Sequence, residues 1–129
     1  MKVKPYIQVD AIDFGISRES VVSLLGNPVS EGRTRKGKVE LEYANAFYRF
    51  NGDNQLIEIS IDAPIVVFGS VSVPFVNLGS FLKEHDHERF EAVGFIVSPL
   101  YGVGFDPGYP SWVTAFLRES LPLWQSYAS

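Results

Sequence analysis

One short run of side chains, His85-Asp86-His87-Glu88, could hold a metal ion. Imidazole and carboxylate groups suit zinc or nickel, so this run is the first place to look for metal chemistry. No second cluster of such residues occurs elsewhere in the sequence. The run also fits a charged surface segment where a helix ends. We favour that interpretation, expect no metal and no other cofactor, and keep His85 and His87 as metal candidates to test.

The sequence contains no local motif for nucleophilic catalysis. A Ser-His-Asp triad assembles in space, but the chain has no Gly-x-Ser-x-Gly nucleophile elbow. The carboxylate pairs Glu40/Glu42 and Glu58/Asp62 have the even spacing that puts both members on one side of a strand, where acid–base chemistry is geometrically possible. Solvated sheet residues are the simpler interpretation. We name no catalytic residue, and a small metal-dependent hydrolase centred on the two histidines stays an alternative.

A basic run lies within the first third of the chain. It contains Arg33, Arg35, Lys36 and Lys38 and has no apolar residue between Ser30 and Lys38. Such a loop can contact a phosphate group or an acidic partner, or it can simply keep the protein soluble. We interpret it as a mobile, solubilising loop and leave the binding role open.

Aromatic residues at predicted surface positions are the remaining candidates. Phe47 points away from the side of its strand that the neighbouring aromatic residues share, and Tyr109 and Trp112 flank a proline turn. Tyr and Trp are favoured at the centres of protein interfaces. The same rings can instead cover sheet edges or pack under the C-terminal tail. As partner-binding residues we single out Phe47, Arg49, Glu58, Tyr109 and Trp112.

The elements that must position these residues begin with a hairpin over residues 47–61. Ile57, Ile59 and Ile61 alternate with polar residues, which predicts a strand with one buried face. The link Asn51-Gly52-Asp53-Asn54 supplies residues that tolerate a positive φ. A further strand is predicted over residues 39–43. The sequence therefore predicts an antiparallel three-stranded meander from 39 to 62.

Two helices are signalled by their ends. Ser17 is a good N-cap and Gly26 a natural residue after the last turn, so a helix is predicted between them. Asn77 is the expected N-cap of a second helix, which ends in the charged run described above. Other predicted strands cover residues 3–9, 65–73 with a bulge at Gly69, 93–97, 101–105 and 112–117. The apolar, proline-broken tail after 121 is expected to lie across the domain.

This order of elements repeats. A helix followed by three strands occurs over about 12–62 and again over about 70–118, with matching capping signals. We therefore expect an α+β fold of two tandem helix–three-strand units. Their strands would form one antiparallel sheet with both short helices on one face. At 129 residues, the chain is expected to be a single domain over 1–129.

Composition limits the classes of partner. The net charge is −4, which disfavours a nucleic-acid-binding protein and makes a basic partner electrostatically easier. There is no cysteine, which excludes disulfides, a thiol nucleophile and cysteine-based metal sites. Residues 1–6 do not resemble a signal peptide, and no apolar run is long enough to span a membrane. We expect a cytoplasmic protein without a membrane partner, in an oligomeric state that the sequence does not specify.

Two patterns resemble known families. The first is a capped helix that ends in Leu25-Gly26-Asn27-Pro28, and the second is a hairpin with Phe50, Gly52 and Leu56. Together they resemble the repeat of β-lactamase-inhibitor-protein-like and small outer-membrane lipoprotein domains, and also small bacterial immunity-type proteins. The resemblance implies a non-enzymatic inhibitor that occludes a cognate toxin or enzyme. A ligand-binding or structural module is a further alternative.

Overall fold

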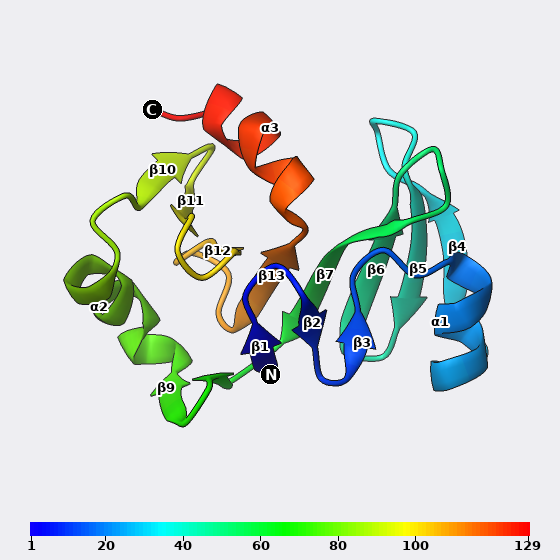
Figure 1. The fold of residues 1–129 in the computed structure, drawn as a ribbon, viewed down its shortest axis with the longest axis horizontal. Helices are drawn as coiled ribbons and strands as arrows, with labels where there is room; N and C mark the ends of the chain where they lie inside the picture. Colours follow the sequence, from blue (N-terminus) through cyan, green and yellow to red (C-terminus); the bar gives the residue numbers. More distant parts are fainter.

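The structure, a computed structural model, describes residues 1–129 and has an α+β fold with three helices and two sheets (Figure 1). The larger sheet has eight antiparallel strands in the order β10-β11-β12-β13-β7-β6-β5-β4. In chain order these strands are β4 (Ser30–Arg33), β5 (Val39–Tyr43), β6 (Ala46–Phe50), β7 (Leu56–Asp62), β10 (Phe90–Ala92), β11 (Phe95–Ser98), β12 (Val103–Phe105) and β13 (Trp112–Phe116). The sheet thus consists of two meanders that are joined where β7 pairs with β13.

The smaller sheet is mixed and has five short strands in the order β3-β2-β1-β8-β9. These strands are β1 (Lys2–Lys4), β2 (Gln8–Val9), β3 (Ile12–Asp13), β8 (Ile65–Phe68) and β9 (Val71–Pro74). Its one parallel pair joins β1 to β8, with Val3 opposite Phe68. The start of the chain is therefore held against a segment more than 60 residues away, as the bond from the Met1 ammonium to the Ile65 carbonyl also shows (3.1 Å).

The first helix, α1 (Arg18–Leu25), is capped as its sequence predicts. The Ser17 side chain accepts a hydrogen bond from the Ser20 backbone N–H (3.1 Å), and Gly26 follows the helix with a φ of 86°. The other helices are α2 (Phe75–His85) and α3 (Leu121–Ser126), and a 3-10 turn over Arg118–Ser120 precedes α3. None of the three is long and apolar enough to cross a membrane.

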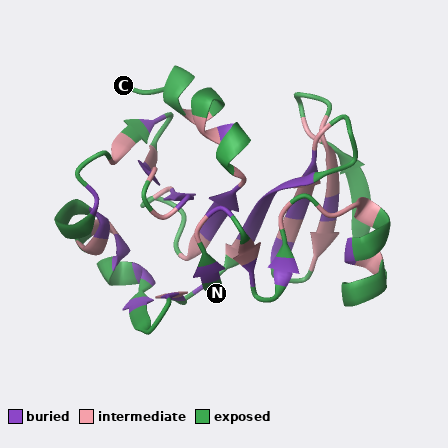
Figure 2. Ribbon diagram, viewed as in Figure 1, coloured by how far each residue is buried: buried purple, intermediate pink, exposed green.

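The main core lies on one face of the eight-stranded sheet. It is a cluster of 21 buried residues drawn mainly from β5–β7, β12, β13, the first two helices of the chain and the smaller sheet. In Figure 2 the buried residues follow the middle strands, whereas α1, β4 and α3 are mostly exposed. A second, smaller cluster lies on the opposite face, where Trp124 and Leu121 of α3 pack on Val97 and Phe116. The main core therefore covers one face of the large sheet except at the exposed edge strand β4, and the smaller cluster covers only part of the other face.

The expectation of two tandem helix–three-strand units is wrong. Each half contributes four strands to the large sheet, a third helix closes the chain, and a separate five-stranded sheet is built from residues of both halves. The sequence pattern did not reveal the second sheet because its strands have two to four residues, too few to show a hydrophobic period. The coarser expectations of an α+β fold and of a large antiparallel sheet are confirmed.

Four local predictions also need correction. The predicted loop 30–38 contains β4, an exposed edge strand whose hydrogen bonds come from pairing with β5. The predicted strand 3–9 is two short strands, and the bulged strand 65–73 is the β8–β9 hairpin, with Gly69 at a φ of 62° in its turn. Helix α2 begins at Phe75 with Pro74 as its N-cap, so Asn77 lies inside the helix.

Candidate functional site

The uncovered part of the outer face lies over β5, β6, β7 and β13. Strand register puts alternate residues of these strands on that face, in rows that cross the sheet. The two central rows are Glu40–Arg49–Glu58 and Phe47–Ser60–Thr114. The residues between them, Tyr48 on β6 and Ile59 on β7, point into the main core. The same strands therefore carry the core on one face and this polar and aromatic surface on the other.

An ion-pair network occupies the first row. Glu58 is only 8% exposed, and its two carboxylate oxygens face Lys38 Nζ (3.3 Å) and Arg49 Nη1 (3.4 Å). Arg49 Nε also donates to Glu40 Oε2 (2.7 Å). Glu58 is thus not the solvated carboxylate expected from its strand position. Two cations compensate for its burial, as a buried charge requires.

Hydroxyl groups extend this network into the second row. Arg49 Nη1 donates to Ser60 Oγ (2.9 Å), which lies 2.7 Å from Thr114 Oγ1 across the β7–β13 pair. The Arg49 guanidinium is therefore held from three sides while part of it stays at the surface. A guanidinium fixed in this way can recognise a carboxylate or phosphate with little loss of side-chain entropy.

An aromatic pocket adjoins the network. Its volume is about 310 Å³, and its lining is Phe47, Arg49, Ser60, Phe95, Asp106, Tyr109, Trp112 and Thr114. The rings of Phe47 and Trp112 pack together with centroids 5.5 Å apart, and Tyr109 is 70% exposed. The turn that carries Tyr109 is fixed at both ends by side chains. Asp106 accepts from the Gly108 N–H (2.8 Å), and Ser111 donates to Asp62 (2.6 Å).

The C-terminal helix covers the neighbouring part of the same face. Trp124 packs on Phe95 and Phe116, with ring centroids 5.3 and 5.9 Å away. The tail thus lies across the domain as predicted, but it packs there and not on Phe47 or Trp112. Those two rings contact each other and border the aromatic pocket.

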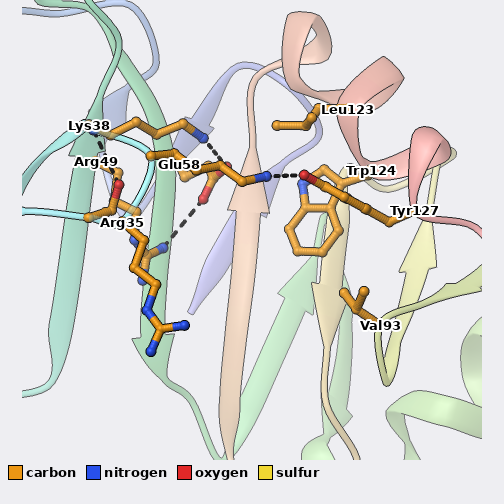
Figure 3. Close-up of a pocket in the computed structure, with 10 residues that line it drawn as sticks. Arg35, Lys38, Arg49, Glu58, Val93, Leu123, Trp124 and Tyr127 are labelled. Atoms are coloured by element: carbon orange, nitrogen blue, oxygen red, sulfur yellow. Dashed lines mark hydrogen bonds and ion pairs between the residues drawn. The ribbon is translucent and has the colours of Figure 1, made fainter.

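A second pocket, here called the cationic pocket, lies between the β4–β5 turn and α3 (Figure 3). Its volume is about 290 Å³, and its lining is Thr34, Arg35, Lys36, Lys38, Arg49, Glu58, Val93, Leu123, Trp124 and Tyr127. Lys36 reaches across from the turn and hydrogen-bonds the Tyr127 hydroxyl. Arg49 lines both pockets, so the two adjoin each other at this side chain.

The structure brings the five predicted partner-binding residues together. Phe47, Arg49, Tyr109 and Trp112 all line the aromatic pocket, and Glu58 lies beside Arg49 in the cationic pocket. Whether they bind a partner stays a prediction.

Sequence reasoning missed the opposite wall of the cationic pocket. Trp124 and Tyr127 lie in a tail for which only packing was expected, and the basic loop was interpreted as solubilising. The signal available was the density of cations in that loop, since four of the eleven Lys and Arg residues fall between 33 and 38.

The His-Asp-His run lies outside both pockets, and its His87 lines another pocket of about 710 Å³ together with Lys83 and Arg89. The His85 ring lies 4.4 Å from the Phe81 ring, and His87 is exposed. Asp86 between them is 3% exposed, and its Oδ2 accepts hydrogen bonds from Ser98 Oγ (2.6 Å) and the Leu100 N–H (3.1 Å). Asp86 thus fixes the loop after β11. The structure contains no group of three or more His, Cys, Asp or Glu side chains that could hold a metal ion.

Comparisons with protein-family models, curated proteins and solved structures give no match to this chain. The resemblance to inhibitor and immunity-type proteins therefore stays a hypothesis.

Proposed function

We propose that this chain is a non-enzymatic protein-binding domain of the inhibitor or immunity type, which covers a functional surface of a bacterial toxin or other enzyme. The observation that carries the proposal is the uncovered aromatic pocket. It combines an exposed tyrosine, a paired tryptophan and a fixed arginine, Tyr109, Trp112 and Arg49. Tyr, Trp and Arg are the residue types that dominate binding energy at the centres of protein interfaces.

The surroundings of the pocket support this use. Its floor is the buried hydroxyl pair of Ser60 and Thr114 on two central strands, so the rings stand on a rigid part of the sheet. Rigid rings lose little entropy on binding, which favours affinity. The mechanism is steric: a partner side chain enters the pocket, and the sheet face and the 106–111 turn exclude substrate from the partner.

The test is capture of the partner from a lysate of the source organism by three versions of the purified chain. These are the wild type, Tyr109→Ala, and the control Val76→Ala. Val76 is 89% exposed on α2, outside the residues that line either pocket. We expect one stoichiometric partner with the wild type and the control. Its affinity should fall by at least about tenfold with Tyr109→Ala, as a central aromatic residue predicts.

Inhibition is measured next, with the purified partner. Its activity should fall at a 1:1 ratio with the wild type, and more Tyr109→Ala protein should be needed for the same effect. Equal capture by Tyr109→Ala and the wild type would place the interface elsewhere. A chain that captures no protein, or a partner whose activity does not change, contradicts the inhibitor function.

A further inference from the structure

The cationic pocket has two unlike walls. One wall is the β4–β5 turn, which two backbone hydrogen bonds hold closed: Thr34 N–H to Lys38 C=O and Gly37 N–H to Thr34 C=O, each 2.9 Å. The other wall is α3. Figure 3 shows Lys38, Arg49 and Glu58 on one side of the pocket and the rings of Trp124 and Tyr127 on the other, with the Arg35 side chain extending away from the rings. A ligand in this pocket therefore meets cations on one side and an aromatic surface on the other.

The charges in the pocket do not balance. Four cations line it, and two carboxylates compensate for two of them: Glu58 pairs with Lys38 and Arg49, and Glu40 pairs with Arg49. The ion pairs of the structure leave Arg35 and Lys36 without a carboxylate. A local excess of two positive charges thus occurs in a chain whose net charge is −4. A phosphate monoester carries about −1.5 to −2 at neutral pH and matches this excess.

The aromatic wall is fixed in place. Phe95 and Phe116 hold the Trp124 ring from the sheet side, while the ring also lines the pocket. The Lys36 ammonium lies 4.3 Å from the centre of the Tyr127 ring and joins the two walls. A fixed indole at the edge of a cationic groove is a surface on which planar rings stack, whatever their exact identity.

We propose that the cationic pocket binds a small ligand made of a phosphate group and a planar ring, of the class of a nucleoside monophosphate. The phosphate lies against Arg35 and Lys36, the two lining cations that no carboxylate compensates, and the ring stacks on Trp124. Arginine recognises phosphate through paired N–H groups, which suits the free guanidinium of Arg35. The volume of about 290 Å³ is at the lower end for small-molecule pockets, so a mononucleotide fits better than a dinucleotide. This ligand site shares Arg49 with the proposed protein interface, but its test needs no protein partner.

The test is calorimetric titration of the wild-type chain with each of the four ribonucleoside 5′-monophosphates, with the matching nucleosides and with inorganic phosphate. We expect at least one monophosphate to bind with 1:1 stoichiometry, and its nucleoside and phosphate alone to bind at least about tenfold more weakly. Tryptophan fluorescence locates the ring, because stacking should quench the wild type and not Trp124→Phe. No binding by any monophosphate, or equal binding by phosphate alone, overturns the proposal.

Charge variants supply the second readout. Arg35→Gln should weaken monophosphate binding by at least about fivefold, since it removes an uncompensated cation. The matched control is Arg33→Gln in the same hairpin, whose guanidinium bonds the Gly37 carbonyl (2.9 Å) and does not line the pocket. Equal weakening by the two variants would indicate nonspecific attraction to the basic hairpin. Quenching that persists in Trp124→Phe would place the ligand elsewhere. Either result overturns the proposal.

Discussion

The two faces of the eight-stranded sheet are built from the same strands, but one carries the buried core and the other a charged surface. Phe50 on β6 and Ile59 on β7 are fully buried in the main core. The residue before each of them, Arg49 or Glu58, belongs to a charged network beside the two pockets. Side chains alternate along a strand, so neighbouring residues have unlike roles. We therefore expect that stability and recognition can be changed separately at adjacent positions.

Phe50→Ala should have the largest effect on stability. Phe50 has no exposed surface, and its truncation should lower the free energy of unfolding by about 3–5 kcal/mol through lost burial and a residual cavity. Phe47→Ala is the matched control, with the same residue type on the same strand but on the outer, half-buried side. Phe47→Ala should lower the free energy of unfolding by less than half as much as Phe50→Ala. Guanidinium unfolding measures both, and equal losses would break the distinction between the faces.

Glu58→Gln should have an intermediate effect, about 1–2 kcal/mol. The change leaves Lys38 and Arg49 close together without the carboxylate between them, and their partial exposure moderates the cost. Salt screens the resulting repulsion, so the loss should shrink between about 0.05 and about 0.5 M NaCl. Urea unfolding at both salt concentrations checks this. A variant as stable as the wild type at low salt would show that the network contributes nothing to stability.

Tyr48→Phe should have the smallest effect at neutral pH and a distinct one at alkaline pH. Burial, with a smaller contribution from the charge of Asp10, raises the pKa of Tyr48 to about 12, compared with about 10 in an unfolded chain. The folded state keeps this proton longer, so the contribution of Tyr48 to stability is complete below pH 10 and is lost as the pH rises towards 12.

The variant lacks that titration, so the wild type should lose stability relative to Tyr48→Phe over this pH range. The difference between the two unfolding free energies is the quantity to follow, because burial also raises the pKa of Tyr6 and Tyr43 in both proteins. A difference that stays constant from pH 9 to 12 would contradict the buried environment of Tyr48.

Local signals predicted those parts of the fold that local interactions determine. Ser17 and Gly26 predicted the bounds of α1, and the alternation around Ile59 predicted the β6–β7 hairpin. Strand β4 gave no signal, because all four of its residues are exposed and its stability comes from pairing with β5. The β1–β8 pair left no signal either, since parallel pairing between distant segments has no local period.

The candidate site was predictable to a similar extent. Alternation along β6 put Phe47 and Arg49 on the outer face, and the structure brings Trp112 to them. The burial of Glu58 was not foreseen, because it depends on β13 pairing with β7 and on Lys38 reaching back over the sheet. The meeting of the basic turn with Tyr127 is a tertiary contact between residues 91 positions apart, and the pattern of neither segment contains it.

The β7–β13 pairing has a consequence for the order of folding. Each meander can form from hairpins between neighbouring strands, but Ser60 and Thr114 come together across 54 residues, so loop-closure entropy delays their pairing. We expect Thr114→Val to speed unfolding more than it slows folding in stopped-flow experiments, as for contacts that form after the transition state. The aromatic pocket takes residues from both meanders, and the cationic pocket joins the first meander to α3, which follows the second. A newly made chain would therefore acquire its binding surface last, and binding would report that folding is complete.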